Sequence, residues 1–100
     1  MKIKTAQVLT SLDGKALKTE GSELTVGNAI ASMLLAPRSE REIYHFDKVK
    51  SFVLAKKFYS DDEVDIDDAD NKKLTDTIES DSTFGPVVSG QILLLLNETK

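Results

Sequence analysis

The chain has 100 residues, a formal net charge of −4 and no cysteine. Its length suits a single domain over residues 1–100 with one core. The composition excludes disulfides, thiol nucleophiles and thiolate metal sites, and the negative charge makes nucleic acid an unfavourable partner, because its phosphates repel the chain. The longest apolar run, residues 92–96, is far too short to cross a bilayer, so we expect no membrane association.

The first residues predict a β-hairpin. Polar and apolar side chains alternate over residues 3–10, although both faces carry some apolar character. Asp13 and Gly14 supply a turn, because glycine tolerates the positive φ that primed hairpin turns require. Residues 16–18 would form the short return strand, and a second turn would follow at residues 20–23.

A helix is predicted next, over residues 26–36. Thr25 is a suitable N-cap, because its hydroxyl can accept a hydrogen bond from an amide of the first turn. Apolar residues then recur with the 3.6-residue period of a helix that is buried on one side. They are Val26, Ala29, Ile30, Met33 and Leu34. Pro37 ends the helix, since the residue before a proline is kept out of the helical region.

The central helix is predicted to begin at a capping box and to run to about Tyr59. In this box Ser39 accepts from the amide of Glu42, whose side chain reaches back. The expected core stripe consists of Ile43, Phe46, Val49, Val53, Leu54 and Phe58. Three aromatic residues lie outside the stripe, namely Tyr44, Phe52 and Tyr59. They indicate a second contact surface, either within the fold or with a partner.

An acidic segment separates the central helix from a third helix. Residues 60–63 break the helical pattern, residues 64–66 are expected to be extended, and Asp65 or Asp67 caps a helix that ends near Ser80. The few apolar residues of this helix are Ala69, Leu74 and Ile78. We therefore expect it to be the most exposed of the helices.

The terminal segment is apolar on almost every side when it is read as a helix with Pro86 in its first turn. Leu93 and Leu94 point to a side that so short a chain cannot obviously cover, so we expect an interface there. Gln91 has two open interpretations. Either it is buried and its partners fix the register of a helix pair, or it lies at the rim in water.

The carboxylates between residues 61 and 70 raise the question of a bound cation. Oxygen ligands at alternate positions are typical of a calcium loop, but the position that needs glycine is Ile66 in one register and Asp70 in the other. Helix capping and favourable charge at a helix N-terminus explain most of these carboxylates without a metal. We favour this structural interpretation over a cation site and over an acidic imitation of nucleic-acid phosphates.

The sequence contains no catalytic signature. His45 is the only histidine, and no serine lies in a nucleophile elbow. The glycines form neither a phosphate-binding loop nor a dinucleotide fingerprint, and no cluster of zinc ligands is present. We therefore expect a protein that is not an enzyme and that uses no cofactor or metal.

Five short stretches carry a family resemblance: Leu12–Lys15, Glu23–Gly27, Leu54–Phe58, Asp62–Asp65 and Pro86–Leu93. Together they span most of the chain, and the order of elements resembles that of a loose group of small, mostly uncharacterised phage-encoded proteins. The resemblance implies a phage or prophage origin, and a location in the cytoplasm of the infected host cell or in the virion. It supplies no catalytic residues.

We therefore expect an α+β fold that is mostly helical, with an N-terminal β-hairpin followed by about four helices. The expected function is that of a small non-enzymatic phage-type protein that works by protein–protein interaction, binding a host factor or a defence component. The alternative is a phage virion or assembly component that packs as a homo-oligomer. The candidate interface residues are Leu93, Leu94, Gln91, Tyr44, Phe52 and Tyr59.

Overall fold

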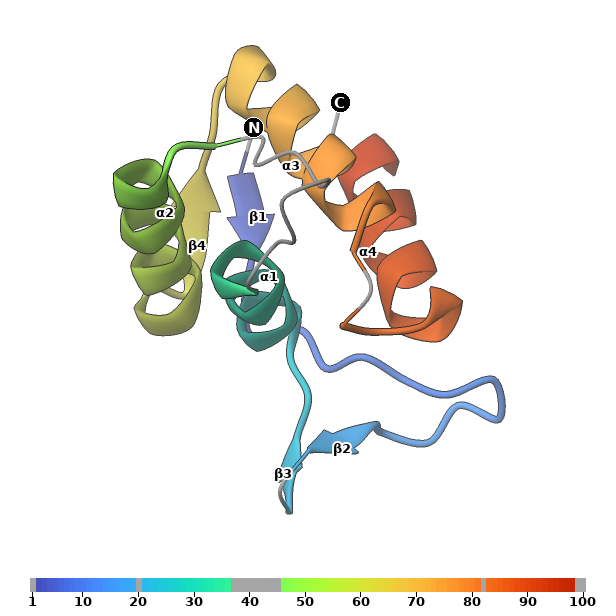
Figure 1. The fold of residues 1–100 in the computed structure, drawn as a ribbon. Helices are drawn as coiled ribbons and strands as arrows, with labels where there is room; N and C mark the ends of the chain where they lie inside the picture. The colour runs from blue at the N-terminus through green and yellow to red at the C-terminus, as the bar shows by residue number, and fades with distance from the viewer. Residues whose placement is uncertain (1, 20, 37–45, 82, 99–100) are drawn as a thin grey trace.

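The structure is a computed structural model that describes residues 2–19, 21–36, 46–81 and 83–98. Over these residues the fold is α+β and mostly helical, with an N-terminal β-hairpin and four helices, as the sequence predicts (Figure 1). The helices are α1 (Val26–Leu35), α2 (Lys48–Ser60), α3 (Asp68–Glu79) and α4 (Pro86–Glu98). Helix α1 packs against both α2 and α3, and α3 packs against α4. Helices α2 and α4 therefore lie at opposite edges of the molecule (Figure 1).

Strand β1 (Lys2–Lys4) pairs with a strand from the middle of the chain, the antiparallel strand β4 (Glu63–Asp65). The three pairs are Lys2 with Asp65, Ile3 with Val64 and Lys4 with Glu63. The two apolar side chains are buried, and each flanking pair opposes a lysine to a carboxylate. The prediction that residues 3–10 pair with residues 16–18 is therefore wrong for β1, because β4 offers it a partner with complementary charges.

The N-terminal hairpin forms farther along the chain. Strand β2 (Lys18–Thr19) pairs antiparallel with β3 (Ser22–Glu23), and a single bridge joins Thr10 to Ala16 ahead of them. This bridge closes the predicted turn, in which Gly14 has a φ of 85° that glycine tolerates without strain. The turn thus projects from the helical body as a loop beside α4 (Figure 1).

Helix α1 begins as the sequence predicts. The hydroxyl of Thr25 accepts from the amide of Asn28 at 3.2 Å, so Thr25 is the N-cap. The helix ends at Leu35, one residue before the predicted end, and Pro37 lies outside the described residues. All five residues of the predicted apolar stripe are buried.

Gly27 lets α1 approach α2 closely. A Cβ at this position would overlap the carbonyl oxygen of Phe58 and would lie 2.7 Å from Cβ of Thr5. The backbone amide of Gly27 donates to the carbonyl of Thr5 at 3.0 Å. The start of α1 is therefore fixed between the N-terminal segment and the end of α2.

Helix α2 begins later than predicted, at Lys48. The carboxylate of Asp47 accepts from the amide of Lys50 at 2.7 Å and caps the helix. The predicted capping box at Ser39 and Glu42, and with it Ile43, lies outside the described residues. Phe46 is buried but precedes the helix, so its burial does not fix which face of the helix turns inward.

The buried face of α2 differs from the predicted stripe for this reason. Its members are Ser51, Leu54, Ala55 and Phe58. Val49 and Val53, which the sequence assigns to the core, are exposed. Among the described residues α2, and not α3, is consequently the helix with the most exposed side chains.

Helix α3 is capped by Asp67, which accepts from the amide of Asp70 at 2.7 Å, and ends at Glu79 as expected. Leu74 and Ile78 are buried, whereas Ala69 is exposed.

Helix α4 begins at Pro86, as predicted, and inserts a stripe of three residues into the core. These are Val88, Ile92 and Leu96. One hydrophobic cluster collects buried side chains from all the helices described above. Among the described residues, no helix has the length and apolar character needed to span a membrane.

Candidate protein-interaction surfaces

The outer face of α2, which we define as Val49, Phe52, Val53, Lys56 and Tyr59, is apolar and exposed. At 100° per residue these positions lie opposite the buried face of the helix. The exposed fractions are 74% for Val49, 60% for Phe52 and 73% for Tyr59. Helix α2 is therefore apolar on two sides, and only one of them is covered by the rest of the described chain.

Lysines surround this apolar face. Lys48 precedes it, Lys56 lies within it, and Lys50 and Lys57 border its other side. Of these four lysines, only Lys50 has a carboxylate partner among the described residues. Its Nζ lies 3.2 Å from Oδ2 of Asp70. The outer face of α2 therefore combines apolar and positive groups in a chain whose net charge is negative.

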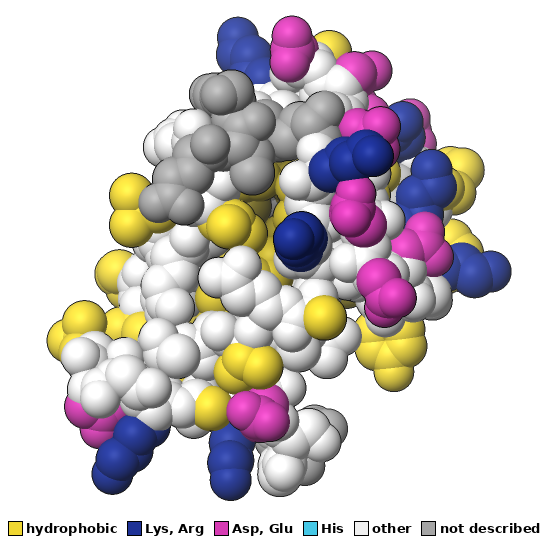
Figure 2. Space-filling model, turned by 180° about the vertical axis from the view of Figure 1, so that it is seen from behind, with side chains coloured by type: hydrophobic (Ala, Val, Ile, Leu, Met, Phe, Trp, Pro, Cys, Tyr) yellow, Lys and Arg dark blue, Asp and Glu magenta, His cyan; other side chains and the backbone are white. Residues whose placement is uncertain are grey.

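The outer face of α4 is also apolar, and we define it as Val87, Gly90 and Leu94. Leu94 is 63% exposed. Leu93, which the sequence places on the same uncovered side, is instead half-buried and packs against the core beside Ile78. Figure 2 shows hydrophobic side chains at both edges of the molecule, with lysines beside those at the edge where α2 lies.

Gln91 is half-buried and makes its hydrogen bonds within the chain. Its Oε1 accepts from the backbone amide of Thr10 at 3.1 Å, and its Nε2 donates to the carbonyl of Thr10 at 2.6 Å. The same Nε2 donates to the carbonyl of Val87. The side-chain amide thus pairs with a backbone peptide as a neighbouring strand would, and it fixes the turn at residues 11–15 against α4.

The turn at residues 11–15 is itself held by local hydrogen bonds. The Ser11 amide donates to the Lys15 carbonyl at 2.9 Å, and the Gly14 amide donates to the Ser11 carbonyl at 3.0 Å. The Ser11 hydroxyl donates to the carboxylate of Asp13, and the Lys15 amide donates to the same carboxylate at 3.1 Å. These bonds lower the pKa of Asp13 below its ordinary value, and the bond from the Ser11 hydroxyl has the largest effect. Leu12 is presented at the tip of this ordered turn.

The acidic segment has structural roles. Asp67 caps α3, Asp68 and Asp70 lie in the first turn of that helix, and Glu63 lies 3.8 Å from Nζ of Lys2 across the sheet. In the described part of the chain, no group of three or more histidine and carboxylate side chains is placed to hold a metal ion.

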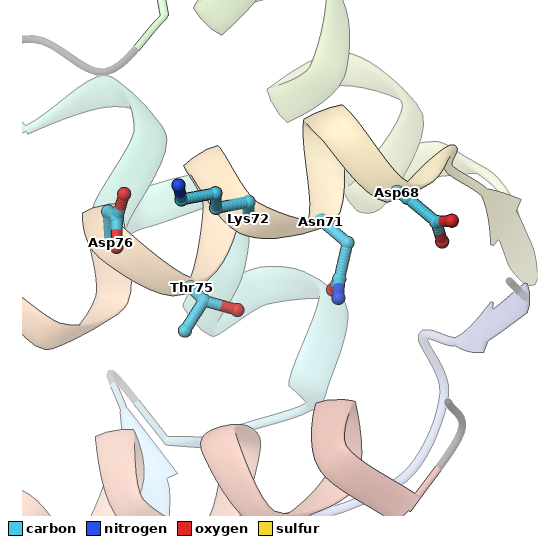
Figure 3. Close-up of a pocket in the computed structure, with 5 residues that line it drawn as sticks. All are labelled: Asp68, Asn71, Lys72, Thr75 and Asp76. Carbon is cyan, nitrogen blue, oxygen red and sulfur yellow. The ribbon is translucent and has the colours of Figure 1, made fainter.

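A hollow of about 480 Å³ runs along α3. Its described lining residues are Asp68, Asn71, Lys72, Thr75 and Asp76. Figure 3 shows Asn71 and Thr75 pointing toward α4, whereas Lys72 and Asp76 lie on the other side of α3. Oδ1 of Asn71 is buried and has no hydrogen-bond partner among the residues that the structure describes, but the other side chains do not converge on it. The hollow does not present groups arranged around one ligand.

The sequence-predicted candidates therefore fall into three groups. Phe52 and Tyr59 share the outer face of α2, and Leu94 lies on the outer face of α4 at the opposite edge. Leu93 and Gln91 are engaged within the chain. Tyr44 and His45 lie outside the described residues.

Sequence reasoning missed several exposed apolar residues. They are Leu12, Leu35, Val49, Val53 and Val87. For Val49 and Val53 the available signal was that α2 is apolar on more than one side, because a surface helix normally buries a single apolar stripe. Comparison of the chain with protein-family models, curated proteins and solved structures gave no match.

Proposed function

We propose that this protein works by binding another protein through the outer face of α2, without chemistry of its own. The observation that supports the proposal is the exposed apolar stripe of Val49, Phe52 and Tyr59. Monomeric proteins rarely expose contiguous apolar patches larger than a few hundred Å², and patches above that size mark interaction sites. Val49, Phe52, Val53 and Tyr59 stand at positions i, i+3, i+4 and i+10 of the helix. Such a face suits a groove or a second helix on the partner.

The surrounding charges indicate the chemistry of the partner. Lys48, Lys56 and Lys57 have no carboxylate partner among the described residues. A partner surface that is apolar opposite Val49, Phe52 and Tyr59 and carries acidic side chains opposite the lysines, including Lys56 at the centre, would complement them. Such charges increase the rate and specificity of association more than its strength. The resemblance to phage-encoded proteins leads us to propose a host factor or a defence component of the infected cell as the target.

A photo-crosslinking experiment tests the proposal. A photoreactive amino acid is placed at position 52 and, as a matched control, at the exposed position Lys72 on α3. We expect position 52 to label one protein in the cells that express the chain, and position 72 not to label it.

The captured protein is then purified and its affinity measured. Because truncation of a central aromatic anchor costs about 2 kcal/mol or more, Phe52→Ser should weaken binding at least about 30-fold, whereas Lys72→Ser should not change it. Equal labelling from both positions, or an unchanged affinity for Phe52→Ser, would refute binding through this face.

The second candidate function is that of a virion or assembly component that packs as a homo-oligomer. The exposure of Leu94 on α4 favours it. The genomic neighbourhood distinguishes the two settings: a position among capsid and tail genes supports assembly, and a position among early or host-directed genes supports binding of a host protein.

A further inference from the structure

Gly90 lies in the middle of α4, on its outer face, where nothing in the described fold requires glycine. Among the described residues, no atom outside the neighbouring backbone of α4 lies within 4 Å of the position that its Cβ would occupy. Glycine in a helix interior lowers helix stability relative to alanine. At Gly27 the close approach of Phe58 and Thr5 explains the glycine, but Gly90 has no such neighbour.

Two grooves meet at Gly90, and Pro86 lines both of them. The larger has a volume of about 540 Å³ and lies between α4 and the turn at residues 11–15. The smaller, of about 290 Å³, lies between α4 and the end of α3. A backbone or side chain that crosses α4 at Gly90 could therefore come closer to the helix axis than at any position with a side chain.

Leu12 provides a projecting group beside the larger groove. Its side chain is 97% exposed, at the tip of a turn that Gln91 fixes against α4. The same face of the molecule thus carries an apolar projection and an apolar groove of more than sufficient volume for a leucine side chain. A surface that carries both features offers a projection and a recess to a second copy, and self-complementarity of this kind is the requirement for an interface with two-fold symmetry.

The charges around the larger groove do not oppose a second copy of the chain as the occupant. Two copies with a net charge of −4 each repel one another. The described residues that line the larger groove are all uncharged: Thr10, Ser11, Leu12, Pro86, Val87, Gly90, Gln91 and Leu94. Two copies that meet through this groove therefore bring no like charges together at its centre.

We propose that the outer face of α4 forms a symmetric homodimer, in which α4 crosses its counterpart at Gly90 and Leu12 of each copy enters the groove of the other. Val87 and Leu94 become buried on either side of the crossing. This inference is independent of binding through the outer face of α2, which lies at the opposite edge of the fold.

Sedimentation at a series of protein concentrations tests the proposal. We expect the wild-type chain to pass from monomer to dimer with rising concentration. Because hot-spot truncations weaken interfaces by about tenfold or more, Leu12→Ser and Leu94→Glu should each raise the dissociation constant at least about tenfold. Both side chains are exposed in the monomer, so their replacement leaves the folded monomer intact, which circular dichroism verifies.

Gly90→Ala distinguishes an interface from a structural role. Alanine should raise the unfolding temperature of the monomer, because it favours the helix, and should weaken the dimer, because its methyl group blocks the close crossing. Phe52→Ser is the control from the opposite edge and should leave the dissociation constant unchanged. A wild-type chain that stays monomeric, or a dimer that tolerates both Leu12→Ser and Leu94→Glu, would overturn the proposal.

Discussion

Helices α2 and α4 are both 13 residues long and both have an apolar outer face, yet the surroundings of the two faces differ. Lysines flank the outer face of α2, whereas the groove along α4 has no charged residue in its described lining. The centre of the first face is the long side chain of Lys56, and the centre of the second is Gly90. Exposed apolar residues alone therefore do not identify a partner. The groups around them do: the lysines on α2 suit a different, acidic protein, and the uncharged groove along α4 accepts a second copy of the chain.

The inner faces of the two helices serve the same purpose. Phe58 on α2 and Ile92 on α4 are fully buried in one hydrophobic cluster. The comparison between inner and outer faces can therefore be tested within a single helix, with residues of the same type.

The largest expected effect comes from the two phenylalanines of α2. Phe58→Ala should lower the free energy of unfolding by about 3–5 kcal/mol, because it leaves a cavity in the core. Phe52→Ala should change it by less than about 0.5 kcal/mol, because the side chain is mostly in water. Urea denaturation followed by circular dichroism measures both. A cost above about 1 kcal/mol for Phe52→Ala would mean that another part of the chain covers the outer face.

The start of each helix from α1 to α4 depends on local signals, and three of the four could be predicted. Thr25, Asp67 and Pro86 act at the positions that their chemistry favours. For α2 two capping signals compete in the sequence, and Asp47 is the one that caps the helix as described. The predicted start and the predicted buried face of α2 are therefore both wrong, because the predicted helix includes Phe46 whereas α2 begins at Lys48.

Contacts between distant segments were not predictable in the same way. The pairing of β1 with β4 has a visible signal, since Lys-Ile-Lys is complementary to Glu-Val-Asp, but many other segments of this length carry alternating charge. The pairing of Gln91 with the backbone of Thr10 has no sequence signal, because any backbone peptide can offer the same two groups. The exposure of Leu94 could be inferred only because α4 is apolar on more sides than a small chain can cover.

The two helical glycines sharpen the comparison between a covered and an uncovered face. Gly27→Ala should lower the free energy of unfolding by about 1–3 kcal/mol, since the methyl group meets the backbone of α2, which cannot move aside cheaply. Gly90→Ala should raise it by about 0.5–1 kcal/mol in the monomer. Denaturation at low protein concentration measures both, because dimerisation would add to the apparent stability at high concentration. A loss of stability for Gly90→Ala in the monomer would show that Gly90 is needed inside the fold.

The most local expected effect concerns the contact between α4 and the turn that carries Leu12. Gln91→Leu should cost about 1–3 kcal/mol, because the amide and carbonyl of Thr10 lose their side-chain partner. Ser89→Ala is the matched control on the same helix. The buried hydroxyl of Ser89 has no hydrogen-bond partner in the described part of the chain, so its removal should be neutral or slightly stabilising. Denaturation gives the energies, and hydrogen exchange at the Thr10 amide reports on the contact itself. Faster exchange in Gln91→Leu with little change in global stability would place the effect in the turn alone. Leu12 would then lose its fixed position, and the α4 dimer should weaken even though no residue of its apolar contact had changed.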